Sequence, residues 1–210
     1  MQKQSKQLVE KYFLKHFRNG EMRRGKNRLI FEVANRYIKR FLALEKDELK
    51  KGNTLKIIAT EQELETSIEV EGIDFPIKIK GIVDRIDEYN GVTRIIDYKT
   101  GTVQSPELKV TDLSTINDYK YSKAIQVLLY TLLYKEDNNI NNDIALEAGI
   151  YSFKNLKSGL LKINFSSNYR TPEHSITSEK LDEAITHICE IIKEIYNPLI
   201  SFKEPEELPY

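Results

Sequence analysis

Apolar side chains recur every three or four residues in four segments of the chain, and this spacing predicts four amphipathic helices. Elsewhere apolar and polar side chains alternate, as they do in a strand with one buried face. The expected helices cover residues 5–18, 27–45, 121–135 and 178–197, the last beginning near Ser178 as a helix cap. The expected strands cover residues 63–71, 73–89, 92–99, 145–153 and 160–165.

This order of elements predicts an α/β fold in which a mixed central sheet has helices on both faces. The helix at 121–135 can cross over between the strands at 92–99 and 145–153, which would make those two strands parallel neighbours. We expect one domain over residues 1–210, with N-terminal helices at 1–52, a sheet core at 53–166 and a C-terminal helix at 178–197. The polar connection at 100–119 has no period and is typical of a functional or mobile loop.

The segment GIVDRIDEYNGVTRIIDYKTG, residues 81–101, contains the strongest hairpin signal in the chain. Asn90-Gly91 favours a two-residue turn in which Tyr89 pairs with Val92. Continued without a bulge, this register places Asp84 opposite Asp97. It also places Asp87 opposite Arg94.

The same register puts Asp84, Asp97 and Lys99 on one face of the hairpin, because side chains alternate along a strand. Facing carboxylates repel unless a proton, a cation or a metal ion separates them, and Mg²⁺ suits carboxylate ligands. The Tyr98 carbonyl could complete such a site. Metal-dependent phosphodiester chemistry and a buried ion-pair network are both compatible with this pattern, whereas Asp87 is expected to form a structural ion pair with Arg94.

Composition narrows the possible compartment and partners. The chain has 32 basic and 32 acidic residues, so only a local patch could attract nucleic acid. Residues 18–28 form such a basic run, which is either a solvated surface or a phosphate contact. One cysteine, Cys189, excludes a disulfide framework within this chain, and no apolar run suggests a membrane span or a signal peptide. These features indicate a cytoplasmic protein.

Three motifs in order, GIVDRID, IIDYKTG and QVLLY, resemble the PD-(D/E)XK nuclease superfamily, and specifically its RecB/AddB-type exonuclease branch. The resemblance implies a restriction-endonuclease-like core and a deoxyribonuclease that uses Mg²⁺ or Mn²⁺. It implies that Asp84 and Asp97 are metal ligands and that Lys99 is the catalytic lysine. The side chains implied to support the site or to contact DNA are Gln126, Tyr130 and Arg85.

The chain departs from that branch at both ends. The usual G-x-x-x-H motif of an N-terminal helix is absent, since His16 lacks the preceding glycine, and no cysteine cluster for an iron–sulfur centre is present. We therefore expect an excised C-terminal piece of a helicase–nuclease subunit, acting on DNA in recombinational repair. Two alternatives remain: a catalytically weak DNA-binding module of the same fold, and a structural interaction domain.

Overall fold

The structure is a computed structural model that describes residues 2–16, 24–168 and 170–203. Its contacts divide the chain into two compact units, residues 1–53 and residues 54–210, which are considered separately below. The expectation of a single domain over the whole chain stays a prediction.

The first unit contains two helices, α1 (Gln2–His16) and α2 (Gly25–Lys50). They pack together through Phe13 and Phe31, whose rings meet edge to face with centroids 5.9 Å apart. Both phenylalanines are buried. The apolar spacing therefore predicted both helices, although α2 extends beyond the expected range at each end.

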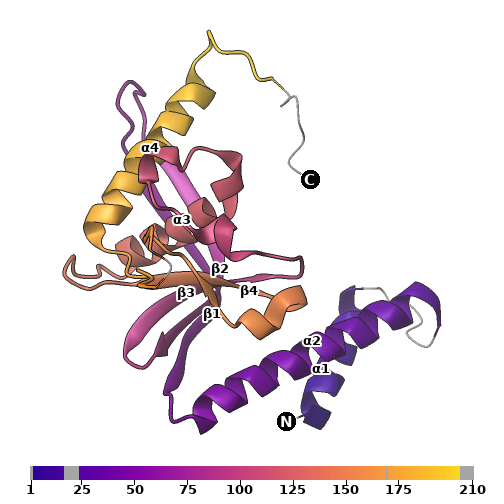
Figure 1. Cartoon of the computed structure of the whole chain (residues 1–210). Helices are drawn as coiled ribbons and strands as arrows, with labels where there is room; N and C mark the ends of the chain where they lie inside the picture. The colour runs from indigo at the N-terminus through magenta and orange to yellow at the C-terminus, as the bar shows by residue number, and fades with distance from the viewer. Residues whose placement is uncertain (1, 17–23, 169, 204–210) are drawn as a thin grey trace. The chain divides into compact units, whose positions relative to one another are not determined.

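The second unit is built on a five-stranded sheet in the order β1-β2-β3-β4-β5 (Figure 1). The strands are β1 (Leu55–Ile68), β2 (Ile77–Tyr89), β3 (Val92–Lys99), β4 (Glu147–Ser152) and β5 (Leu161–Lys162). Only β3 and β4 are parallel, and the other neighbouring pairs are antiparallel. This mixed sheet with helices confirms the α/β, restriction-endonuclease-like fold and the parallel pairing expected from the crossover.

Helix α3 (Ser122–Asp137) connects β3 to β4 and packs on the sheet, and α4 (Ser178–Tyr196) packs on α3 (Figure 1). Fully buried side chains of α3, including Ala124, Val127 and Leu128, join those of the strands in one core. The cap of α4 is Thr177 rather than Ser178, because the Thr177 side chain accepts a hydrogen bond from the Lys180 amide.

The connection between β3 and α3 is not the polar loop that the sequence suggested. It forms three short 3₁₀ helices, η1 (Ser105–Leu108), η2 (Leu113–Thr115) and η3 (Tyr119–Tyr121), and a fourth, η4 (Phe153–Ser158), follows β4. Five apolar side chains of the connection are buried in the core: Val103, Leu108, Val110, Leu113 and Ile116. This burial fixes the chain directly after Lys99. No helix within residues 2–16, 24–168 and 170–203 is both long and apolar enough to cross a bilayer.

Candidate active site

The β2–β3 hairpin turns at Asn90 and Gly91, which have φ values of +51° and +84°. These left-handed conformations are those of the two-residue turn expected from the sequence. The strands pair from Tyr89–Val92 to Arg85–Ile96 in the predicted register, which includes the pair between Asp87 and Arg94. The predicted register is therefore confirmed over this part of the hairpin.

The predicted backbone pair between Asp84 and Asp97 does not form, because the ladder ends one position earlier. Instead, Asp84 Oδ2 accepts a hydrogen bond from the Tyr98 amide at 2.6 Å. Side chains three positions apart, Val83 and Ile86, both lie in the core, so the alternation of β2 is interrupted at Asp84. The carboxylate of Asp84 takes the place of a strand carbonyl and still lies beside Asp97.

The neighbouring strand β1 is distorted at the same level. Glu61 has a φ of +51°, and it lies between the Thr60–Arg85 and Gln62–Val83 pairs. A left-handed conformation is unfavourable for a residue with a side chain. We attribute the interruption at Asp84 to this distortion of its partner strand.

Asp97 and Lys99 lie on the face of β3 that α3 covers, and Gln126 of α3 joins them. Lys99 Nζ donates to Gln126 Oε1 at 2.8 Å and to Asp97 Oδ1 at 3.2 Å. The Gln126 amide nitrogen also donates to Asp97 Oδ1, at 3.2 Å. The three side chains expected from the motifs are thus brought into one hydrogen-bonded group.

Tyr130 stands one turn after Gln126 and extends this group. Its hydroxyl accepts a hydrogen bond from Gln126 Nε2 at 2.9 Å. Its ring lies against Gly81 of β2, where an added Cβ would be only 2.8 Å from Tyr130 Cε1. Glycine at position 81 therefore allows α3 to approach the sheet closely enough for Gln126 to reach Asp97.

Asp97 keeps one oxygen available for a ligand. Oδ2 is buried and accepts no hydrogen bond among the described residues, although Lys99 Nζ lies 3.0 Å away as an ion-pair partner. Burial raises the pKa of Asp97 above its ordinary value, and the charge of Asp84 acts in the same direction, while Lys99 lowers it. A buried carboxylate oxygen with spare acceptor capacity beside a second carboxylate fits a hard divalent cation.

Asp84 and Asp97 have no further histidine, cysteine or carboxylate ligand beside them among the described residues. Within the described parts of the chain, no three side chains of histidine, cysteine, aspartate or glutamate cluster closely enough to hold a metal ion. A cation held by Asp84 and Asp97 would need further ligands from water, substrate or backbone, as Mg²⁺ commonly has. The Tyr98 carbonyl stays a predicted ligand.

Arg85 lies on the opposite face of the sheet and does not join Asp97 and Lys99. It is buried and donates through Nε to Asp87 Oδ2 at 2.8 Å. Arg94 donates to both oxygens of the same carboxylate, at 2.7 and 2.9 Å. The structural ion pair between Asp87 and Arg94 is thus confirmed, and Arg85 completes it. A role of Arg85 toward DNA stays a prediction that this position does not favour.

The role of Ser152, at the end of β4, was not predicted from the sequence. Its buried hydroxyl donates to the Gly101 carbonyl at 2.8 Å and accepts from the Val103 amide at 3.3 Å. Ser152 is also the parallel-strand partner of Lys99. It therefore holds the chain that leaves β3 after Lys99. A lone serine after an apolar strand carries no pattern from which this could be read.

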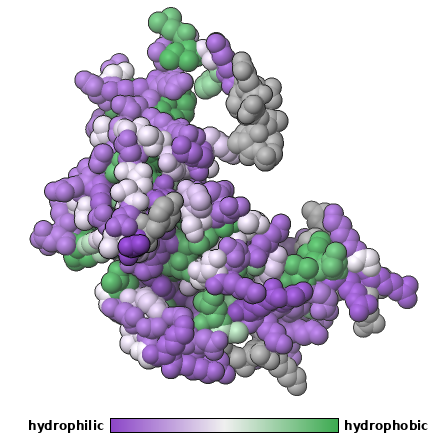
Figure 2. Space-filling view, viewed as in Figure 1, coloured by the Kyte–Doolittle hydropathy of each residue, from purple (hydrophilic) through white to green (hydrophobic). Residues whose placement is uncertain are grey.

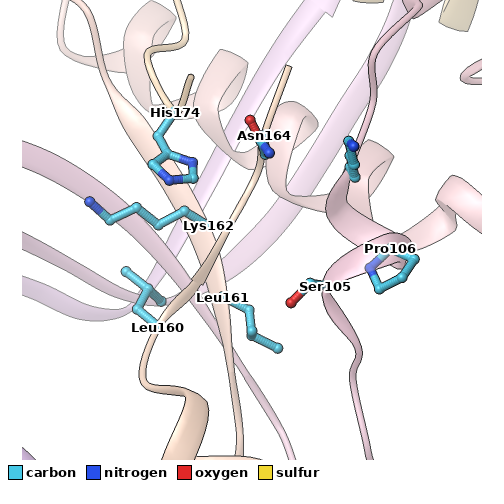
Figure 3. A pocket seen from close by; sticks show the side chains of 8 residues that line it. Ser105, Pro106, Leu160, Leu161, Lys162, Asn164 and His174 are labelled. Atoms are coloured by element: carbon cyan, nitrogen blue, oxygen red, sulfur yellow. The ribbon is translucent and has the colours of Figure 1, made fainter. Parts of the chain in front are cut away.

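A separate pocket of about 400 Å³ opens between η1 and the β5 region (Figure 3). Its lining includes Ser105, Lys162 and His174, with Leu161 and Asn164 between them. His174 Nδ1 is hydrogen-bonded to the Ile163 carbonyl at 2.7 Å. None of the residues around this pocket belongs to the group of Asp84, Asp97, Lys99 and Gln126.

Comparison with known proteins gives a family for the chain, although no curated protein matches it significantly. The model of the PD-(D/E)XK nuclease superfamily matches residues 2–207, which is nearly the whole chain. The letters of its name denote one aspartate and then an aspartate or glutamate two positions before a lysine. Asp84, Asp97 and Lys99 have this pattern. The chain belongs to the PD-(D/E)XK nuclease superfamily.

Proposed function

We propose that this chain is a metal-dependent deoxyribonuclease that hydrolyses phosphodiester bonds at the site formed by Asp84, Asp97 and Lys99. Membership of the superfamily implies a hydrolase that acts on nucleic acid. The observation that carries the proposal is the group in which Lys99 and Gln126 hold Asp97 while its Oδ2 keeps acceptor capacity. A carboxylate oxygen carries two lone pairs, so Oδ2 can bind a cation in addition to its ion pair with Lys99 at 3.0 Å.

Asp84 and Asp97 would hold Mg²⁺ or Mn²⁺, which supplies a bound water of lowered pKa and polarises the phosphate. Lys99 places its ammonium group beside this position, and its side chain is 31% exposed, so it can meet a substrate. A fixed cation there stabilises the negative charge that grows on the phosphate oxygens in the transition state. Gln126 keeps the amine and the acid in place through its amide.

The finer assignment rests on the resemblance of the three motifs to the RecB/AddB-type branch. We propose on that ground that cleavage is exonucleolytic and serves recombinational DNA repair. A helicase subunit, or helicase domains in a longer polypeptide, is the partner that this assignment implies.

One comparison of substrates tests both the proposed metal-dependent nuclease activity and the proposed exonucleolytic cleavage. The chain is incubated with linear single-stranded, linear duplex and covalently closed circular DNA, with Mg²⁺, with Mn²⁺ and with EDTA. Metal-dependent loss of the linear substrates with survival of the circle supports an exonuclease. Cleavage of all three supports an endonuclease and overturns the finer assignment.

Lys99→Ala is the matched variant, because it removes the ammonium group and leaves both carboxylates. It should abolish cleavage and leave DNA binding in EDTA close to that of the wild type. If the wild type binds DNA but cleaves no substrate with either metal, the chain is a DNA-binding module of the same fold, and the nuclease proposal fails.

A further inference from the structure

The zero net charge of the chain conceals two oppositely charged parts. Residues 1–53 contain 15 lysines and arginines and six acidic residues, a formal charge of +9. Residues 54–210 contain 17 basic and 26 acidic residues, a formal charge of −9. These two ranges are the two compact units of the chain, so each unit has a large formal charge of its own. The unit that contains Asp97 and Lys99 therefore repels a polyanion at long range.

The basic residues of α2 are concentrated on one side of the helix. At 100° per residue, six basic residues of α2 fall within about 120° around the helix axis. They are Arg28, Arg36, Lys39, Arg40, Lys46 and Lys50, which we call the basic face of α2. Glu32 and Asp47 share this sector and are its acidic members. The buried side of the helix, with Phe31, lies away from it.

The basic face is available to a partner. All six of its side chains are exposed. Among the described residues, five of the six cations form no ion pair, and the sixth, Lys50, pairs with Asp47 at 3.5 Å. Figure 2 shows hydrophilic side chains over much of the visible surface of α2. Five unpaired cations on one helix face are a source of binding energy that folding of the unit does not use.

The dimensions of the basic face suit a nucleic-acid backbone. From Arg28 to Lys50 the helix rises about 33 Å, close to one turn of B-form DNA. Arginine and lysine side chains on such a surface bind phosphates and release condensed counterions, which gives affinity without sequence preference. The exposed lysines of α1, Lys6, Lys11 and Lys15, add positive charge to the same unit.

We propose that the basic face of α2 binds the phosphate backbone of DNA and supplies the electrostatic affinity that the acidic catalytic unit lacks. The choice of DNA as the polyanion rests on the proposed function. The proposal assigns binding to the first unit and hydrolysis to the second. It explains how a chain of zero net charge can hold a highly charged substrate.

The test measures binding apart from cleavage. Fluorescence anisotropy with labelled single-stranded and duplex DNA in EDTA gives Kd across salt concentrations from about 50 to about 200 mM. The test variant is Arg36→Gln/Lys39→Gln/Arg40→Gln, since glutamine preserves helix propensity. The control variant is Lys56→Gln/Lys193→Gln/Lys203→Gln, which removes the same charge from exposed positions of the second unit. Circular dichroism verifies that both variants remain helical.

The test variant should bind DNA at least about tenfold more weakly at low salt, and its slope of log K against log salt should be shallower by about 2 to 3. The control variant should match the wild type in both quantities. Equal losses in the two variants, or no loss in the test variant, overturn the proposal. So does a result in which the test variant binds DNA normally and loses binding only to anionic phosphatidylserine vesicles.

Lys99→Ala separates this proposal from the nuclease assignment. It should lower the salt slope by at most about 1, the share of a single phosphate contact, and weaken Kd far less than the test variant does, whether or not the chain is a nuclease. The test variant, in turn, should regain cleavage at saturating DNA if the nuclease assignment holds. If DNA binds through α2 but no variant cleaves it, only the nuclease assignment is contradicted. If the test variant cleaves DNA and binds it as the wild type does, only the role of α2 is contradicted.

Discussion

Gln126 Oε1 accepts a hydrogen bond from Lys99 Nζ at 2.8 Å, across 27 residues of sequence. The nitrogen of the same amide donates to Asp97 Oδ1 and to the Tyr130 hydroxyl. Both hydrogens and the oxygen of this side chain are thus used. One residue of α3 fixes the orientation of the acid and the amine relative to each other.

Replacement of Gln126 by leucine should lower kcat for DNA cleavage by about 10- to 100-fold, the usual cost of losing a supporting hydrogen bond at a metal site. Leucine keeps much of the side-chain volume, so α3 should stay in place. Single-turnover cleavage at saturating DNA measures the effect. Tyr130→Phe is the control, because it removes one hydrogen bond at the edge of the group and should cost less than about tenfold. Wild-type kcat in Gln126→Leu would show that the amide does not position Lys99.

Gly81→Ala should destabilise the second unit by about 1–3 kcal/mol, the range for an added methyl group in a packed site. Its Cβ would lie 2.8 Å from Tyr130 Cε1 and 3.3 Å from Leu133 Cδ1. Urea unfolding measures the change. Gly101→Ala is the matched control, since its Cβ would have no neighbour within 4 Å. In a Tyr130→Ala background the cost of Gly81→Ala should shrink; an unchanged cost would mean that the ring is not the obstacle.

The hairpin could be derived from sequence because its signals are local. Asn90-Gly91 sets the turn, and alternation then fixes the register as far as Arg85 and Ile96. The pairing of Asp87 with Arg94 follows from the same rule. The order of strands and crossover likewise determined that β3 and β4 are parallel.

The features that escaped prediction depend on distant partners. The interruption at Asp84 coincides with the conformation of Glu61 on another strand, which no pattern within the hairpin reveals. The core residues after Lys99 follow 3₁₀ turns, whose irregular spacing hides their burial. The functions of Gly81 and Ser152 are set by what they touch. Gln126 was identified only through a family motif.

Ser152→Ala should cost about 1–3 kcal/mol of unfolding free energy, because it leaves the buried Val103 amide without its acceptor. The loss should also loosen the chain after Lys99, since the Ser152 hydroxyl holds the Gly101 carbonyl. Hydrogen exchange at the Val103 amide should accelerate in proportion to the lost stability. Ser158→Ala, at an exposed position after β4, is the control and should change neither quantity. Unaltered exchange in Ser152→Ala would remove Ser152 from the support of the site.

Asp97→Asn should stabilise the metal-free protein near neutral pH while abolishing metal binding. Burial, followed by the smaller repulsion of Asp84, raises the pKa of Asp97 above 3.8 in the folded chain, against the lowering effect of Lys99. The folded state therefore binds more protons than the unfolded state between 3.8 and the raised pKa. The free energy of unfolding then falls as pH rises through this window, and it stays reduced above it. Asparagine, which carries no charge, removes that loss.

Thermal unfolding in EDTA at several pH values measures this effect. The Tm of Asp97→Asn should exceed that of the wild type at pH 7, and the difference should vanish below about pH 4, where the carboxyl is protonated in both states. The control is Asp118→Asn, because the Lys120 amide and ammonium lower the pKa of the exposed Asp118 and give the opposite sign. Added Mg²⁺ should raise the Tm of the wild type and leave that of Asp97→Asn unchanged. An Asp97→Asn protein that is less stable than the wild type in EDTA at pH 7 would identify Asp97 as a stabilising ion-pair member, because its charge would then favour folding without a metal.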